Sequence, residues 1–137
     1  MIERLLLDTA YALALLNPRD QYHLKVMALL PRFSKAEVWV TEAVLTEIGD
    51  GLSTVDRVSA FTFIRRIALS VDSRVINVDS MLFQDALNLY GSRSDKRWSL
   101  TDCISFVIMK RNGLALALTS DHHFVQAGFR ALMLEEP

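Results

Sequence analysis

Short apolar runs alternate along the chain with longer stretches of helical apolar spacing, and this order predicts a parallel β-sheet whose strands are connected by helices. Several short runs, such as Leu5-Leu6-Leu7, contain no polar residue, as expected for strands buried on both faces. The predicted strands are 4–7, 37–40, 74–78, 114–118 and 130–134. The sequence therefore predicts an α/β sandwich with about five parallel strands.

Helices are expected in the intervals between these strands, where apolar residues recur with a helical period. The predicted helices are 10–16, 20–33, 42–49, 55–68, 81–90 and 101–112. Gly113 follows the last of them and is expected to end it in the left-handed conformation. The most polar loop is 91–98, in which Arg93, Lys96 and Arg97 either contact phosphates or form a solvated surface. Trp98 either stacks on a base or anchors this loop to the core.

Length and composition are those of one small globular domain spanning residues 1–137. The chain is 51% hydrophobic, and at this length folding buries roughly two-thirds of the surface of the unfolded chain, so the core requires no disulfide or structural metal. Cys103 is the single cysteine, which is typical of a reducing compartment and predicts a cytoplasmic protein. Mean hydropathy is +0.23, yet no apolar run approaches the roughly 20 residues of a membrane span, and the first residues do not resemble a secretion signal.

The net charge is −1, from 15 Lys and Arg against 16 Asp and Glu. This balance argues against a protein that binds nucleic acid through a strongly basic surface, and it is compatible with a local basic patch.

Four carboxylates follow the predicted strands at the end where parallel sheets bind ligands. Asp8 ends the first strand, Glu47 lies in the second turn of the helix after the second strand, Asp102 opens the helix 101–112, and Asp121 follows the strand 114–118. Four converging carboxylates repel one another unless cations neutralise them. Mg²⁺ or Mn²⁺ suits such a site because both ions prefer oxygen ligands.

Each aspartate also has an interpretation without function. Asp8 and Asp121 are placed to cap helices, and Ser99 with Asp102 has the spacing of a capping box. Glu47 lies too deep in its helix to cap it and is otherwise a solvated surface carboxylate.

These residues and their flanking sequences resemble a known family. The segments that carry the resemblance are Leu5-Leu6-Leu7-Asp8-Thr9, Asn17-Pro18-Arg19-Asp20-Gln21-Tyr22-His23, Leu45-Thr46-Glu47-Ile48, Leu100-Thr101-Asp102-Cys103 and Thr119-Ser120-Asp121-His122-His123-Phe124. The chain is similar to PIN-domain ribonucleases of the kind found as VapC-type toxins of toxin–antitoxin systems. The resemblance covers nearly the whole length and is weakest over 55–97.

The resemblance implies a PIN-like three-layer α/β/α sandwich and a metal-dependent endoribonuclease. It implies that Asp8, Glu47, Asp102 and Asp121 form the catalytic, metal-binding site for Mg²⁺ or Mn²⁺, with Thr9 and Thr119 at neighbouring hydroxyl positions. It also implies an RNA substrate, a small antitoxin protein that restrains the enzyme by inserting a helix or an arginine into the acidic groove, and a homodimer.

Several alternatives stay open at this stage. His122 and His123 are candidates for a metal-independent nuclease, although adjacent side chains diverge. His23 and Cys103 are expected to serve packing. At the level of function, the alternatives are an RNA-processing nuclease outside a toxin–antitoxin system and a non-catalytic α/β binding module whose acids only cap helices.

Overall fold

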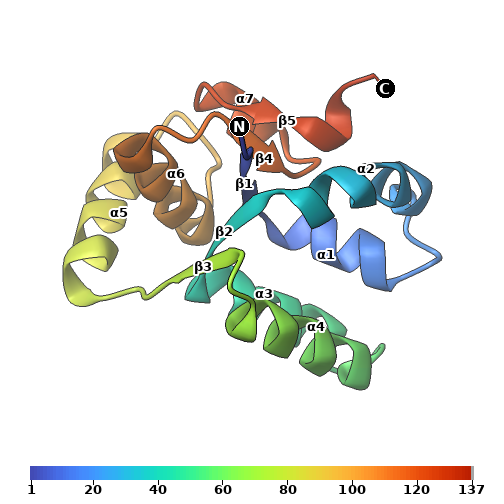
Figure 1. Cartoon of the computed structure of the whole chain (residues 1–137). Helices are drawn as coiled ribbons and strands as arrows, with labels where there is room; N and C mark the ends of the chain where they lie inside the picture. Colours follow the sequence, from blue (N-terminus) through green and yellow to red (C-terminus); the bar gives the residue numbers. More distant parts are fainter. Residues whose placement is uncertain (137) are drawn as a thin grey trace.

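The computed structural model describes residues 1–136 and contains a five-stranded sheet in the order β3-β2-β1-β4-β5, with every neighbouring pair parallel (Figure 1). The strands are β1 (Arg4–Leu7), β2 (Glu37–Thr41), β3 (Ser73–Ile76), β4 (Leu116–Leu118) and β5 (Arg130–Ala131). The helices are α1 (Thr9–Leu16), α2 (His23–Lys35), α3 (Glu42–Leu52), α4 (Arg57–Leu69), α5 (Ser80–Ser92), α6 (Leu100–Asn112) and α7 (His122–Gln126), and a 3₁₀ turn, η1, spans Leu132–Leu134. Across residues 1–136, no helix has both the length and the apolar character needed to cross a membrane.

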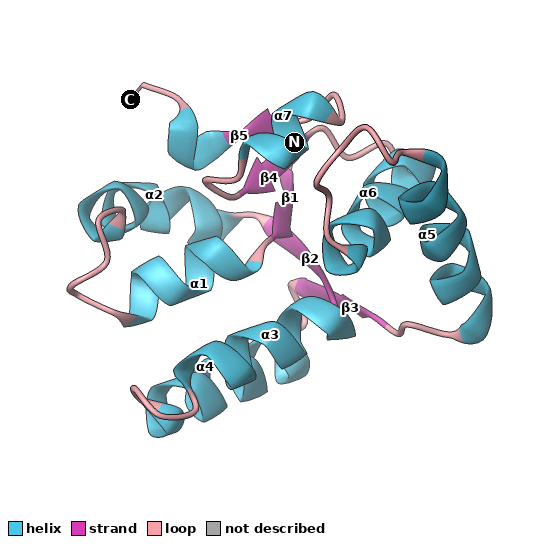
Figure 2. Cartoon of the chain, turned by 180° about the vertical axis from the view of Figure 1, so that it is seen from behind, coloured by secondary structure: helices cyan, strands magenta, loops and turns pink. Residues whose placement is uncertain are grey.

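The helices cover both faces of the sheet because the order of the strands reverses at β1. From β1 the chain moves outward to β2 and β3, and then returns to place β4 on the other side of β1. Because connections between parallel strands are right-handed, this reversal puts the later helices on the opposite face. Helices α1 to α4 lie on one side of the sheet and α5 and α6 on the other (Figure 2). The predicted α/β/α sandwich is confirmed.

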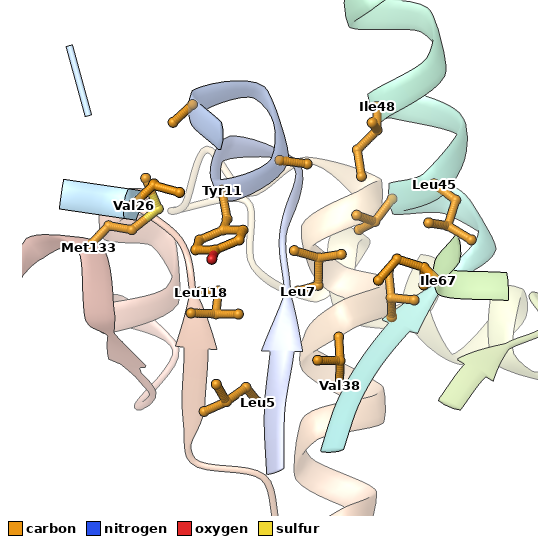
Figure 3. Packing of buried hydrophobic residues seen from close by; sticks show 14 of the residues in the cluster. Leu5, Leu7, Tyr11, Val26, Val38, Leu45, Ile48, Ile67, Leu118 and Met133 are labelled. Atoms are coloured by element: carbon orange, nitrogen blue, oxygen red, sulfur yellow. The ribbon is translucent and has the colours of Figure 1, made fainter. Parts of the chain in front are cut away.

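Successive side chains along each strand point to opposite faces of the sheet, and this divides the core into two halves. Leu5 and Leu7 point into the cluster under α1 to α4, which Figure 3 shows, whereas Leu6 points into the cluster under α5 and α6. Val38 and Trp39 divide in the same way. The central strands therefore have both faces buried, which explains why their inner positions, Leu5 to Leu7 and Val38 to Val40, are all apolar.

The structure corrects the predicted ends of several elements. The run 114–118 is a strand only from Leu116, and the run 130–134 leaves the sheet after Ala131 to form η1. The N–H of Met133 then donates to the carbonyl of Thr119, so that Leu132 and Met133 fill the core instead of extending a strand. Helix α2 starts at His23 and not at residue 20 because the Asp20 carboxylate accepts a bond from the Tyr22 N–H in a preceding turn.

The fully buried Leu5 gives a direct test of this packing. Leu5→Ala should lower the free energy of unfolding by roughly 2–5 kcal/mol, since it leaves a cavity between β1 and the helices. Leu24→Ala, at a leucine that is 82% exposed, is the matched control and should change it by less than about 0.5 kcal/mol. Denaturant titration measures both, and equal effects would contradict the assignment of β1 to the core.

Candidate metal centre

The acidic residues gather where the strand order reverses. Strand β1 pairs with β2 on one side and with β4 on the other, so the carboxyl ends of β1 and β4 lie side by side at the switch point of the sheet. This is where open α/β sheets bind ligands. Leu7 is in register with Leu118, which places Asp8 next to Thr119.

Asp8 is a buried carboxyl group, only 6% exposed. It precedes α1, yet its side chain makes no capping bond, so the capping interpretation is wrong for this residue. Its Oδ2 instead accepts a hydrogen bond of 2.7 Å from the Thr119 hydroxyl. The pKa of Asp8 is raised to about 7. Burial is the largest cause and the charges of Asp102 and Asp121 also raise it, whereas the hydrogen bond from Thr119 lowers it.

Asp102 has the capping role and also faces the site. Its Oδ2 accepts the Ser99 N–H at 3.2 Å, and its own N–H donates to Ser99 Oγ at 3.0 Å, forming a capping box at the start of α6. Burial raises the pKa of Asp102, and the charge of Asp121 raises it further. Bonds from Ser99 and His123 lower this pKa without cancelling the increase. The predicted cap and the predicted convergence therefore occur in one residue.

Asp121 is joined to Asp8 through Thr119. The Asp121 N–H donates to Thr119 Oγ1 at 3.0 Å, while the same hydroxyl donates its proton to Asp8. Asp121 Oδ1 also accepts the His123 N–H at 2.8 Å and so caps α7. Thr119 is completely buried, and this single hydroxyl fixes the relative positions of two carboxylates.

His123 is the site residue that the sequence analysis did not place among the acids. Its Nδ1 lies 3.2 Å from Asp102 Oδ2 and 3.2 Å from Asp121 Oδ1. Ligand atoms of Asp102, Asp121 and His123 lie within 4.8 Å of one another, an arrangement that can hold a metal ion. The feature of the sequence that could have identified His123 as a site residue is its position in the first helical turn after Asp121. The adjacent His122 is exposed.

Glu47 lies outside this three-residue cluster and is exposed on α3. Its Oε1 accepts a short hydrogen bond of 2.6 Å from the Thr9 hydroxyl, and Thr9 directly follows Asp8. The structure thus links Glu47 to the acidic edge through one side chain. Its role as a metal ligand remains a prediction.

Other residues singled out in the sequence have structural roles. Cys103 is fully buried in the core. The Nδ1 of His23 lies 2.7 Å from the Ala14 carbonyl and connects α2 to α1. Trp98 is 7% exposed, and its Nε1 donates to Gln126 Oε1 at 3.0 Å. Trp98 therefore anchors its loop, as one of the two interpretations proposed.

No protein-family model and no curated protein sequence matches the chain. Among solved structures, it is similar to the Mycobacterium tuberculosis toxin VapC20, with 28% identity, a TM-score of 0.82, and 92% of this chain and 96% of that chain covered. That structure is described as a toxin that cleaves the sarcin-ricin loop. The fold also matches FitAcB from Neisseria gonorrhoeae, with 20% identity, a TM-score of 0.62, and 93% and 94% of the two chains covered.

The parallel sheet, with aspartates converging beside β1 and β4, defines a PIN-domain protein. Within this class, the chain is similar to the VapC-type toxin VapC20 over nearly the full length of both chains.

The raised pKa of Asp8 predicts an unusual effect of pH on stability. The folded, metal-free protein holds the Asp8 proton up to about pH 7, whereas the unfolded chain loses it near pH 4. Stability should therefore fall as pH rises through this window, because only the unfolded state can ionise without cost. Asp8→Asn removes the penalty and should make the metal-free protein roughly 1–4 kcal/mol more stable than the wild type at pH 8.

This advantage should shrink towards pH 4, where Asp8 is neutral in both states. Denaturant titrations in chelator at the two pH values measure it, with the exposed Asp50→Asn as the control for loss of one negative charge. An Asp8→Asn protein that is less stable than the wild type at pH 8 would show that Asp8 does not carry a buried, unfavourable charge.

Proposed function

We propose that the protein is a metal-dependent endoribonuclease that hydrolyses RNA phosphodiester bonds, and that it acts as the toxin of a toxin–antitoxin pair. The observation that carries this proposal is the convergence of Asp8, Asp102 and Asp121 from three different elements onto one edge of the sheet. The description of VapC20 as a toxin that cleaves the sarcin-ricin loop supports an RNA substrate.

The chemistry of the donor set fits a hard divalent cation. Burial and mutual repulsion raise the pKa values of Asp8 and Asp102, so the folded protein gains from a positive charge at this edge. Within residues 1–136, no Lys or Arg forms an ion pair with Asp8, Asp102 or Asp121, and the only such partner is His123. Carboxylate oxygens are the ligands that Mg²⁺ and Mn²⁺ prefer.

In this proposal, Asp8, Asp102 and Asp121 hold Mg²⁺ or Mn²⁺ directly or through water. Such an ion, when bound, would lower the pKa of a water molecule and polarise a phosphoryl oxygen of the substrate. Glu47 orients the attacking water from the open side of the site, since its carboxylate is exposed and fixed by the Thr9 hydroxyl. Hydrolysis forms a bond from the water oxygen to phosphorus and breaks the bond from phosphorus to the leaving oxygen. The attacking water gives up one proton, and the leaving oxygen takes up one proton to become a hydroxyl group.

His123 acts as a positioning residue in this scheme. Its backbone N–H bonds Asp121, and its Nδ1 lies between Asp102 and Asp121. These contacts help to fix the positions of both carboxylates.

The proposed partners are RNA, an antitoxin protein and a second copy of the chain. Since no Lys or Arg of residues 1–136 pairs with Asp8, Asp102 or Asp121, this acidic edge is suited to an arginine of an inhibitory partner, which would replace the charge of the metal. The homodimer is a prediction from the family resemblance.

The metal mechanism predicts that RNA cleavage requires Mg²⁺ or Mn²⁺ and stops in excess chelator. Asp102→Asn and Asp121→Asn should each lower kcat by at least about a hundredfold, because the ion supplies several kcal/mol of transition-state stabilisation. Fluorescent single-stranded RNA measures cleavage, and Asp50→Asn is the control with the same change of charge. Undiminished cleavage by Asp102→Asn would exclude this mechanism.

Thermal unfolding separates the nuclease from a non-catalytic binding module. Mn²⁺ at a hundred times its dissociation constant should stabilise the wild type by about 2.7 kcal/mol. The Asp102→Asn protein should lose most of this effect. Equal stabilisation of both proteins, or none in either, would contradict metal binding at Asp102.

A growth experiment tests the toxin function separately from the chemistry. Induced expression of the wild type in a bacterial host should arrest growth, because cleavage of essential RNA stops translation, whereas Asp121→Asn at the same protein level should not. Unimpaired growth with an active wild-type enzyme would favour an RNA-processing nuclease.

A further inference from the structure

Two hollows flank Trp98, and their linings contain five basic side chains and no acidic one. The first, of 540 Å³, lies along the loop between α5 and α6 and is lined by Arg93, Lys96 and Arg97. The second, of 330 Å³, lies between α5, α6 and the end of α7 and is lined by Arg93, Lys110 and Arg111. A third of the 15 basic residues of a chain with net charge −1 is concentrated here.

Three of these cations are available to a ligand. Arg93 pairs with Asp95, and Arg111 pairs with Asp85. Lys96, Arg97 and Lys110 form no ion pair with any carboxylate of residues 1–136. By contrast, the hollow between α3 and α4 contains one acid and one base, Asp50 and Arg57, among mainly apolar side chains.

The first hollow adjoins the acidic site through Ser99. Ser99 lines it, and the backbone and hydroxyl of the same residue bond Asp102. Lys110 lies eight residues after Asp102 on α6, which corresponds to about 12 Å along a helix. Cations are thus placed at two distances from the proposed scissile phosphate on one side of the site.

The loop that carries these cations is firmly held. Trp98 packs edge-on against Phe106 at 5.1 Å between ring centroids, and its Nε1 bonds Gln126 of α7. The Arg93 guanidinium lies over the indole ring, 4.9 Å from its centroid. The indole of Trp98 is therefore packed against protein groups, and the side chains that the loop offers to a ligand are positively charged.

We propose that an RNA strand leaving the acidic edge runs along the α5–α6 loop, where Lys96 and Arg97 each contact one of the two phosphates nearest the site and Lys110 contacts a more distant one. This inference rests on the proposed function and specifies how the substrate is held. The contacts are to phosphates, so they contribute affinity and position without reading the base sequence.

The salt dependence of RNA binding tests this placement. For single strands, the slope of log K against log salt concentration is about −0.7 per phosphate contact. In chelator, which prevents cleavage, Lys96→Gln/Arg97→Gln should weaken binding of a fluorescent single-stranded RNA and make the slope about 1.4 less negative. Lys110→Gln should change it by about half as much.

Arg65→Gln/Arg66→Gln is the matched control, since it removes two adjacent exposed charges from α4 on the opposite face. An equal change of slope in this control, or none in the loop variants, would overturn the proposal. Thermal unfolding midpoints confirm folding, and Lys110→Gln provides the same test if the double variant is unstable.

Cleavage kinetics distinguish the loop from the catalytic site. The loop variants should raise KM with kcat nearly unchanged, because uniform binding is lost. A fall in kcat alone would instead indicate that the change disturbs Ser99 and Asp102. If the wild type binds RNA through the loop and cleaves none, the nuclease proposal fails and the binding proposal stands; if it cleaves and the slopes do not change, the reverse holds.

Discussion

The repulsion among buried carboxylates at the end of β1 and β4 is the constraint around which the site is built. Ligand atoms of Asp102 and Asp121 lie within 4.8 Å of each other, and at an effective dielectric constant near 20 two full charges at that distance repel by roughly 3 kcal/mol. Asp8 adds a third carboxyl, whose pKa is raised to about 7 chiefly by burial and also by the charges of Asp102 and Asp121. The fold has to hold these groups together against their own electrostatics.

Two structural features keep these carboxylates close together despite their repulsion. The first is the register of β1 with β4, fixed by completely buried leucines, which brings Asp8 and Thr119 side by side. The second is a set of hydrogen bonds to the carboxylates from the Thr119 hydroxyl, the Ser99 backbone, and the His123 backbone and ring. Capping and metal binding are therefore not alternatives here. Asp102 and Asp121 each accept a backbone N–H bond, from Ser99 and from His123 respectively, with one carboxylate oxygen. These bonds orient both carboxylates towards the common edge of the sheet.

The sequence predicted the parallel sheet and the aspartates because both depend on short-range patterns. Apolar runs such as Leu5-Leu6-Leu7 identify buried strands, and the residue that follows such a run lies at the ligand-binding end of the sheet. The place of His123 was not predictable in the same way, since its contact with Asp102 joins residues 21 positions apart. The turn at Leu132 was missed for a similar reason. Its apolar residues suit a strand locally, and only the carbonyl of Thr119 and the space beneath α1 and α2 redirect them.

A nearly neutral chain resolves the conflict between binding a cation and binding a polyanion by separating its charges. Asp8, Asp102 and Asp121 lie at the end of the sheet, where a divalent ion would neutralise them, and five cations line the adjoining hollows around Trp98. Ser99 lies at the boundary, with its polar groups bonded to Asp102 and its surface facing the basic loop. An RNA strand is repelled by the acidic edge alone and attracted by the loop alone, so the metal and the loop have to act together. Phosphate contacts weaken as the salt concentration rises, whereas metal binding weakens as the carboxylates become protonated. The basic loop and the acidic edge therefore respond to different solution conditions, so the contribution of each can be measured separately.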